Sequence, residues 1–434
     1  RPPARDTRRP AHRGDPALNG FEESRRSGQN DAGRARCAIT KGKPTMPAIR
    51  LRTRLTAALL GLAMICLAPL TGAAQVPFET RAPNILIKDV NTGQILLDRN
   101  SDVPLPPASM SKLMTLLMLF EAIEDGRVTM ETTWTVSQRA HEMGGSRMFL
   151  ETRHRPTTED LIRGIAVLSG NDATVAVAEG LAGSEEAFAQ IATQRAREMG
   201  MTGTNIMNAS GWPHPEHRMS LRDLAMLAQH ILAEYPQYYP YLAEREFTWN
   251  NITQPNRLPL IGAGLGMDGL KTGHTSEAGY ALTGSALQGT RRIVFVFSGL
   301  ASERERAEEA ERIINWAFRQ FTELSIATEG ETLAEAEVWM GASPSVSLVA
   351  PRDYAMVVPV VAEGEASARI DYAGPISAPI TAGQELARLV ITTPGMQDLE
   401  LPLVAGHDVA EGGFVPRIRS AALVLAGHLG LAAR

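Results

Sequence analysis

Cysteine is nearly missing from this chain, which has two among its 434 residues. Cys37 lies in a leader rich in Arg, Pro and Gly, and Cys66 lies within an apolar run near the N-terminus. If both segments are removed, the remaining chain has no thiol. Such a chain has no disulfide framework, no thiol nucleophile and no cysteine-based metal site. Several enzyme classes are thereby excluded.

The chain also lacks a strong excess of charge and an apolar run long enough to cross a bilayer. Its net charge is −5, which gives no electrostatic case for nucleic-acid binding. The apolar run Leu55–Leu70 is shorter than the ~20 residues that a membrane span needs. Apolar residues make up 44% of the chain, enough for two or three domains with sizeable cores.

The N-terminal region has the three successive parts of a secretory signal peptide. Arginines precede the run Leu55–Leu70, and the small residues Gly72-Ala73-Ala74 follow it. We therefore predict that residues 1–45 are an over-read upstream of a start at Met46. Residues 46–74 are the predicted signal peptide, so the protein is expected to be exported to the periplasm.

Hydrophobic patterns predict a mixed α/β (α+β) domain over residues 75–322. The runs Ile85–Ile87 and Ile95–Leu97 flank a turn sequence and predict a β-hairpin. Helical spacing dominates the middle of the chain, and strands return at Ile293–Phe297. A long helix then carries Ala307–Phe321, with its apolar residues on one face. Together these segments predict a mixed sheet covered by helices.

The composition and the hydrophobic pattern of the sequence change after about residue 330. Short Val-rich segments (Tyr354–Val361, Ala368–Tyr372 and Leu386–Thr392) alternate with Gly and Pro turns and predict a small β-sandwich domain over 330–412. The tail, 416–434, is apolar on one helical face and basic elsewhere. It favours an amphipathic helix in the membrane interface, and the alternative is a terminal helix packed on the β domain.

A serine and a lysine three residues apart begin an apolar helical run at Met110–Phe120. Pro107 is compatible only with the first turn of this helix. Positions three apart share a helix face, so Ser109 Oγ and the Lys112 amine are expected to meet. Lys112 can activate a serine only when neutral, which costs a lysine of pKa ~10.4 about 4–5 kcal/mol near pH 7. Taken alone, the spacing also fits an N-cap serine and a solvated lysine.

A second motif, Lys271-Thr272-Gly273, lies in a segment predicted to be a strand. Lys271 offers a second cation that would lower the pKa of Lys112. Gly273 has no side chain to block the edge of the strand, so a peptide can dock there. Lys271 and Thr272 would then meet the carboxylate of that peptide.

A third motif, Ser169-Gly170-Asn171, interrupts two apolar helices and would point polar side chains into a cleft. Ser169 is placed to pass a proton to a leaving amine, and the Asn171 amide to hold a substrate amide. A different pair, His214 and His217, has prolines at 213 and 215 that preclude the helical spacing of zinc proteases. We predict a surface loop near the mouth of the cleft for this pair.

The three motifs in this order resemble those of the penicillin-recognising serine enzymes, and most closely the serine-type D-Ala-D-Ala carboxypeptidases, which are low-molecular-mass penicillin-binding proteins. The flanks Pro107–Thr115, Leu168–Ala173 and Asp268–Thr275 match as well. The resemblance covers roughly Pro83 to the end. It implies a β-lactamase-like catalytic domain with a mainly antiparallel sheet flanked by helices, a small β domain, an amphipathic tail, and no cofactor or metal.

The resemblance also implies a role for each matched residue. Ser109 is acylated by the penultimate D-Ala carbonyl of a peptidoglycan stem peptide, Lys112 is the general base, and Ser169 relays a proton. The backbone N–H groups of Ser109 and His274 form the oxyanion hole. Arg306 helps hold the terminal carboxylate, although it also fits a solvated charge on an acidic helix. The implied substrate-binding residues are Asn171, Lys271, Thr272, Gly273, His274 and Arg306. β-Lactam antibiotics are the implied inhibitors, and the inner-membrane surface is a partner of the tail.

Three alternatives stay open. A class A-type β-lactamase usually carries Ser-Asp-Asn and Glu-x-x-Leu-Asn, whereas this chain has Gly170 within its motif and no Glu-x-x-Leu-Asn downstream. A muropeptide endopeptidase differs only in the peptide bond that it cuts. A non-catalytic penicillin- or peptide-binding module belongs to a different class, and intact Ser109, Lys112 and Lys271 argue against it.

Overall fold

The computed structural model describes residues 78–362, 364–414 and 418. The predicted over-read at 1–45 and signal peptide at 46–74 lie outside these residues, as does the tail 416–434 apart from position 418. Among the helices that are described, none combines the length and the hydropathy that crossing a bilayer requires.

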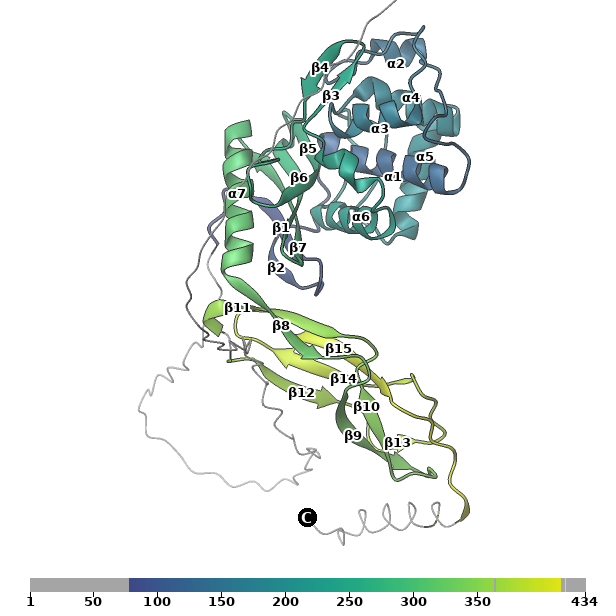
Figure 1. Cartoon of the computed structure of the whole chain (residues 1–434), viewed down its shortest axis with the longest axis vertical. Coiled ribbons are helices and arrows are strands. Elements are labelled where there is room, and N and C mark those ends of the chain that lie inside the picture. Colours follow the sequence, from purple (N-terminus) through teal and green to yellow (C-terminus); the bar gives the residue numbers. More distant parts are fainter. Residues whose placement is uncertain (1–77, 363, 415–417, 419–434) are drawn as a thin grey trace, which may run out of the picture. The chain divides into compact units, whose positions relative to one another are not determined.

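A five-stranded antiparallel sheet forms the framework of the N-terminal part of the fold (Figure 1). Its strand order is β2-β1-β7-β6-β5, so β5 lies at an edge. The mainly antiparallel sheet expected from the sequence is thereby confirmed. The strands are β1 (Asn84–Asp89), β2 (Ile95–Arg99), β5 (Met267–Thr275), β6 (Gly279–Gln288) and β7 (Arg291–Leu300), and a separate hairpin contains β3 (Glu246–Trp249) and β4 (Ile252–Pro255).

Helices cover both faces of this sheet (Figure 1). Along β7, Val294 and Val296 pack in the core shared with α1 to α6, whereas Phe295 and Phe297 pack in the core shared with α7. This alternation follows from the two-residue period of a strand, and burial of both faces explains the continuous apolar run Ile293–Phe297 within β7. The helices are α1 (Lys112–Glu124), α2 (Gln138–Glu142), α3 (Thr158–Ala166), α4 (Asn171–Ala182), α5 (Glu185–Glu198), α6 (Leu221–Glu234) and α7 (Glu303–Arg319), with 3-10 turns at η1 (Ala108–Ser111) and η2 (Tyr239–Ala243).

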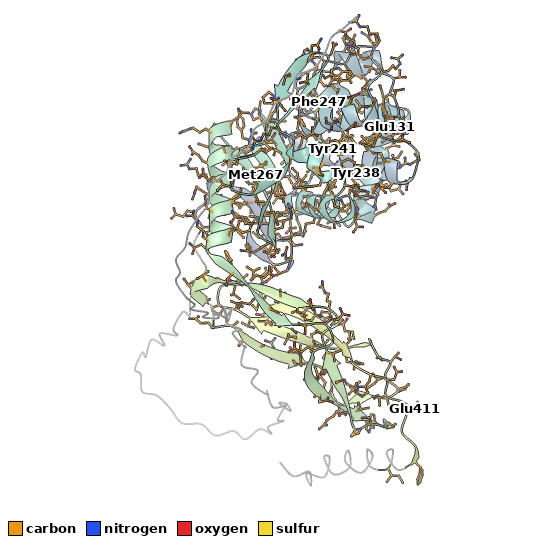
Figure 2. All side chains as sticks on the ribbon, in the orientation of Figure 1. Glu131, Tyr238, Tyr241, Phe247, Met267 and Glu411 are labelled. Carbon is orange, nitrogen blue, oxygen red and sulfur yellow. The ribbon has the colours of Figure 1, made fainter. Side chains whose placement is uncertain are left out.

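Helix α1 is the central helix of the larger core. Every residue from Lys112 to Phe120 is buried, so the helix is surrounded by other elements on all sides. Figure 2 shows how side chains fill the space around it, with Tyr238 and Tyr241 among the helices and Met267 on the sheet. A charged residue at the start of such a helix has no solvent to hydrate it, which matters for the site.

The remaining strands form an all-β region with a core of its own. Six strands pair in the order β12-β14-β15-β10-β9-β13, and β8 pairs with β11. The sequence patterns missed β8, β9, β10, β13 and β15, and Phe321, expected on the face of α7, is instead the first residue of β8. The elements are β8 (Phe321–Ala327), β9 (Thr332–Trp339), β10 (Ser345–Val349), β11 (Tyr354–Pro359), η3 (Val360–Ala362), β12 (Ser367–Asp371), β13 (Ile376–Ser377), β14 (Glu385–Thr392) and β15 (Leu399–Ala405).

Candidate active site

Ser109 lies in a tight turn that leads directly into α1. The preceding residue, Ala108, has a φ of +50°, which is a left-handed conformation that costs a non-glycine residue free energy. The Ser111 hydroxyl donates to the Ala108 carbonyl at 3.1 Å and helps to hold the turn. Backbone strain of this kind is typical of functional sites, where the surrounding structure maintains it.

The fully buried Lys112 side chain contacts Ser109, which is partly exposed. Lys112 has an exposed fraction of 0%, and its Nζ lies 2.9 Å from Ser109 Oγ. The same nitrogen donates to the backbone carbonyl of Ser210. Both contacts are to uncharged oxygens, so neither offsets the lost hydration of an ammonium as a carboxylate would. The setting therefore favours the neutral amine that can accept a proton from a serine.

Electrostatics at Lys112 differ in one respect from the sequence-based prediction. Burial is the main cause that lowers the pKa of Lys112 to about 7, and the Arg257 guanidinium is the cation that adds to it. Lys271 was expected to be that cation, but its own pKa lies well below its usual value, because of burial first and then Lys112. Since the two buried amines repel each other as ammonium ions, protonation of one disfavours protonation of the other.

Edge strand β5 brings its motif against the Ser109 turn. Lys271 and Thr272 are buried, whereas His274 is exposed at the end of the strand. A Cβ added at Gly273 would lie 3.0 Å from the Pro107 carbonyl oxygen and 3.1 Å from Met110 Cγ. The lack of a side chain at Gly273 therefore allows β5 to pack closely on the turn. This is a second reason for a glycine here, in addition to the open strand edge predicted from the sequence.

The Ser169-Gly170-Asn171 motif holds a loop in place beside the turn. Ser169 is buried with a φ of +59°, and Asn171 begins α4. The Asn171 side-chain amide donates one N–H to the Gly144 carbonyl at 2.8 Å, so its second N–H and its Oδ1 remain for a substrate amide. The next residue, Asp172, is fully buried and accepts from the backbone N–H groups of Met148 and Leu150. This carboxylate fixes the loop that Asn171 contacts.

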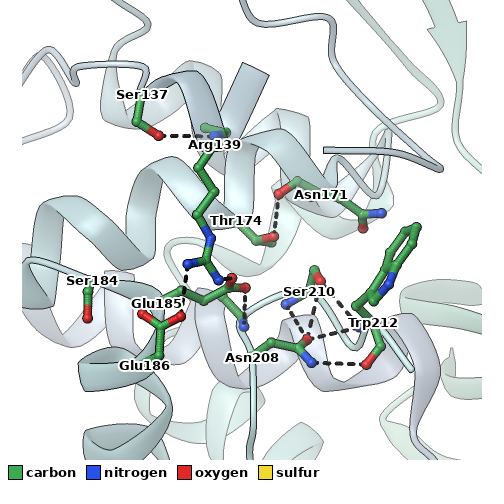
Figure 3. Close-up of polar contacts among 12 residues, drawn as sticks. Ser137, Arg139, Asn171, Thr174, Ser184, Glu185, Glu186, Asn208, Ser210 and Trp212 are labelled. Atoms are coloured by element: carbon green, nitrogen blue, oxygen red, sulfur yellow. Dashed lines mark hydrogen bonds and ion pairs between the residues drawn. The ribbon is translucent and has the colours of Figure 1, made fainter. Parts of the chain in front are cut away.

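A polar network positions the Ser210 carbonyl that Lys112 contacts (Figure 3). The Glu185 carboxylate accepts from Arg139 at 2.6 Å and from the backbone N–H of Ala209 at 3.0 Å. Next to it, Asn208 Oδ1 accepts from the N–H groups of Ser210 and Trp212 at 3.2 and 2.9 Å. Segment 208–212 is thus held from both sides, and the sequence contained no motif that indicated it.

Replacement of Gly211 by alanine is expected to lower the free energy of unfolding by about 2–5 kcal/mol. Gly211 has a φ of +76°, and an added Cβ would overlap the Ala108 carbonyl oxygen. Gly183 is the matched control, because its φ is +81° and nothing lies within 4 Å of its added Cβ. Gly183→Ala should therefore cost only the conformational part, about 1–2 kcal/mol, in urea denaturation. Equal losses at both positions would contradict the close packing of segment 208–212 on the Ser109 turn.

Arg306 is buried near the exposed end of β5. Its exposed fraction is 5%, its guanidinium lies 5.6 Å from the Tyr280 ring centroid, and it pairs with Glu303 at 3.3 Å. The Tyr280 ring in turn lies 4.0 Å from the His274 ring. The alternative that Arg306 is a solvated charge is wrong, because the side chain is enclosed by these neighbours.

Comparisons with known proteins agree on one family. A family model for D-alanyl-D-alanine carboxypeptidase matches residues 71–300, and one for the C-terminal domain of penicillin-binding protein 5 matches 321–411. D-alanyl-D-alanine carboxypeptidase DacF of Bacillus subtilis is 32% identical over 84% of this chain and 96% of its own length. Penicillin-binding protein 5 from Haemophilus influenzae superposes with a TM-score of 0.71 at 32% identity, covering 77% of this chain and 99% of its own. Penicillin-binding protein D2 from Listeria monocytogenes, in its ampicillin-bound form, shares the fold at 24% identity (TM-score 0.52; 56% of this chain, 100% of its own).

Proposed function

The chain belongs to the D-alanyl-D-alanine carboxypeptidase family of serine hydrolases, and we propose that Ser109 is the residue on which its acyl-enzyme forms. Enzymes of this kind remove the terminal D-alanine from peptidoglycan pentapeptides. The observation that supports Ser109 most strongly is the 2.9 Å contact between its Oγ and the Nζ of Lys112, a lysine with 0% exposure. A serine is a weak nucleophile until such a base removes its proton.

The reaction runs in two steps on these side chains. Neutral Lys112 accepts the Ser109 proton while Oγ attacks the penultimate D-Ala carbonyl carbon. The C–N bond then breaks, and the proton on Lys112 passes through Ser169 to the departing D-alanine amine, which leaves Lys112 neutral again. In the second step water attacks the ester carbon and gives a proton to Lys112, the ester C–O bond breaks, and Lys112 returns that proton to Oγ as the acid product leaves. No oxidant, reductant or metal ion takes part in this sequence.

Backbone and basic groups complete the proposed site. The N–H groups of Ser109 and His274 stabilise the oxyanion, and the loss of one such donor typically costs about 10²–10³ in rate. Lys271 and Thr272 bind the terminal carboxylate together with Arg306, whose burial strengthens the interaction. Because β5 is an edge strand, the substrate peptide can lie along it. Gly273 permits its close packing, and the Asn171 amide, with one N–H and Oδ1 available, binds a substrate amide.

β-Lactam antibiotics acylate the same serine in this proposal. Their strained amide carbonyl is attacked by Ser109 Oγ, and the resulting ester persists because no leaving group departs to make room for water. The ampicillin-bound relative from Listeria monocytogenes supports this reading at the level of the fold. Peptidoglycan stem peptides are the proposed substrates.

The function is tested by D-alanine release from a defined pentapeptide, using the full chain. We expect release of one D-alanine per peptide together with labelling by a fluorescent penicillin. Efficient hydrolysis of the penicillin would instead indicate a β-lactamase, and cleavage of cross-linked dimers an endopeptidase. Labelling without D-alanine release would favour the non-catalytic binding module.

Location and domain limits are part of the proposal. We infer export to the periplasm after removal of the signal peptide 46–74, a catalytic domain at 75–322 and a β domain at 330–412. The tail 416–434 would hold the enzyme at the inner-membrane surface through its apolar face and arginines. Fractionation of cells that express the chain with and without 416–434 tests the last point.

The rate of acylation is expected to fall tenfold for each pH unit below about 7, because Lys112 must be neutral and its pKa is about 7. The sign follows from the role of the amine: a proton on Lys112 removes the base, so activity rises with pH through 7 and then levels. kcat/KM for D-alanine release, measured from pH 5 to 9, checks this profile. A rate that stays constant down to pH 5 would argue against Lys112 as the base.

A further inference from the structure

A cavity of about 260 Å³ opens directly beside the Ser109 turn. Its walls come from three segments: the residues before Ser109, the stretch from Gly211 to His217, and the residues that follow His274 at the end of β5. The wall residues that matter here are Ala108, Trp212, His214, His217, Thr275 and Glu277. The proposed reaction leaves this cavity unused.

His217 is the buried titratable side chain among the wall residues of this cavity. It was expected in a surface loop, but its exposed fraction is 2%, so the surface prediction is wrong for this residue. Its Nδ1 accepts from the Met207 backbone N–H at 3.4 Å, which places the ring proton on Nε2. Among the described residues, Nε2 has no hydrogen-bond partner. A buried donor without an acceptor is costly, and a ligand that supplies an acceptor would remove this cost.

A permanent positive charge near His217 favours an anionic acceptor. Burial, together with His214, Lys112 and Arg218, lowers the pKa of His217 to about 4. The ring is therefore a neutral donor at neutral pH, and the Arg218 guanidinium, which stays charged, attracts a negative charge beside it. The acidic group on the rim, Glu277, is paired with Arg218 at 3.0 Å and is mostly exposed.

The orientation of the bound peptide decides which of its residues lies beside this cavity. The terminal carboxylate is drawn to the basic groups Lys271 and Arg306, so the peptide runs away from them past the Ser109 turn. Trp212 forms the wall on that side: a Cβ added at Gly145 would lie 3.3 Å from its ring and 2.9 Å from the Asn171 amide. Figure 3 shows the Trp212 indole and the Asn171 amide on the same side of the network. The residue that precedes the two D-alanines thus comes closest to the cavity, about 3.5 Å along the chain from the penultimate one.

We propose that this cavity is a subsite for the side chain of the residue that precedes the two D-alanines, and that it selects a side chain ending in a carboxylate. The carboxylate accepts from His217 Nε2–H, and the methylene stem packs on Trp212. An ammonium on the same side chain would face Glu277 at the rim. This inference rests on the proposed function, because it takes Ser109 as the position of the scissile carbonyl.

Two pentapeptides that differ by one carboxylate test the subsite with the full chain. One has meso-diaminopimelate in third position and the other has L-lysine, which is the same side chain without its terminal carboxylate. We expect kcat/KM for D-alanine release to be about 10–100-fold higher for the diaminopimelate peptide, as one hydrogen bond from a buried donor to a carboxylate implies. Equal values, or a preference for lysine, would overturn the subsite and leave the proposed function intact. Release from neither peptide would overturn both.

Variants assign the preference to His217. In His217→Phe the ratio of the two kcat/KM values should fall to near 1, whereas His217→Gln, which keeps an N–H donor, should retain part of it. His230 provides the control, since its Nε2 is also buried without a partner among the described residues but lies outside the cavity, on α6. His230→Phe should leave the ratio unchanged. A ratio that persists in His217→Phe, with the variant still releasing D-alanine, would overturn the assignment.

Discussion

Replacement of Ser109 by alanine is expected to abolish D-alanine release and labelling by fluorescent penicillin together. The Oγ atom is the only part of the side chain that is lost, and it is the atom that contacts Lys112 at 2.9 Å. Removal of a catalytic nucleophile typically lowers kcat by about 10⁴-fold or more, because the remaining site only binds and polarises the substrate. The substitution is small and adds no volume, so the fold should survive.

Ser111 provides the matched control within the same turn. Ser111 is buried, whereas Ser109 is partly exposed, and the Ser111 hydroxyl donates to the Ala108 carbonyl instead of contacting Lys112. Ser111→Ala should therefore loosen the turn and keep covalent labelling by penicillin. Mass spectrometry of the labelled protein gives a second readout, because the added mass should lie on the peptide that contains Ser109. Labelling that persists in Ser109→Ala would place the nucleophile elsewhere.

The motifs at Ser109, Ser169 and Lys271 were predictable from the sequence because each is local. Positions 109 and 112 meet through helical spacing, and positions 271–273 lie in one strand, so no long-range information is needed to see them. The hairpin of β1 and β2 and the face of α7 follow from simple periodicity in the same way. In the structure β5 packs on the Ser109 turn and α4 packs on α1, and only the resemblance to a family indicated that these elements come together.

The residues that the sequence did not reveal act across long separations. Arg257 lies in a loop after β4 without any motif, yet it is the cation that adds to the effect of burial on the pKa of Lys112. Ser210 contributes only its backbone carbonyl. Every residue type carries that group, so the residue type does not indicate the contact. The prolines at 213 and 215 argue against a helical zinc site at His217 and so favour a loop, but burial of its ring depends on tertiary contacts that composition does not encode.

The β region shows the same limit in its secondary structure. Segments that are apolar and Val-rich, such as β11 and β14, were found from the sequence. β9 and β15 contain exposed glutamates and are less apolar than β11 and β14, although β15 alternates, with Leu401, Leu403 and Ala405 buried.

Replacement of Lys112 is expected to have the second large effect, and two substitutions separate its causes. Lys112→Met keeps most of the buried volume and removes the amine, so acylation by penicillin should slow by about 10²–10⁴-fold through loss of the general base. Lys112→Arg restores a nitrogen near Ser109, but a guanidinium stays protonated at neutral pH and cannot accept the serine proton. Both variants should therefore acylate slowly. A stopped-flow measurement of penicillin labelling gives the rate constants.

The control for both variants is Lys88, another lysine whose pKa burial lowers, which donates to Gln229 away from the site. Lys88→Met should leave the acylation rate within about threefold, because surface or half-buried charges outside the site rarely alter a chemical step.

The pH profile adds a separate criterion: the decline of the wild-type rate below about pH 7 should be absent from the residual rate of Lys112→Met, since the titrating amine is gone. If Lys112→Arg acylates within tenfold of wild type, the base is a different group, and Lys271, whose pKa is also lowered, becomes the candidate. Together the two variants test whether Lys112 must be neutral, and not only whether a nitrogen must lie near Ser109.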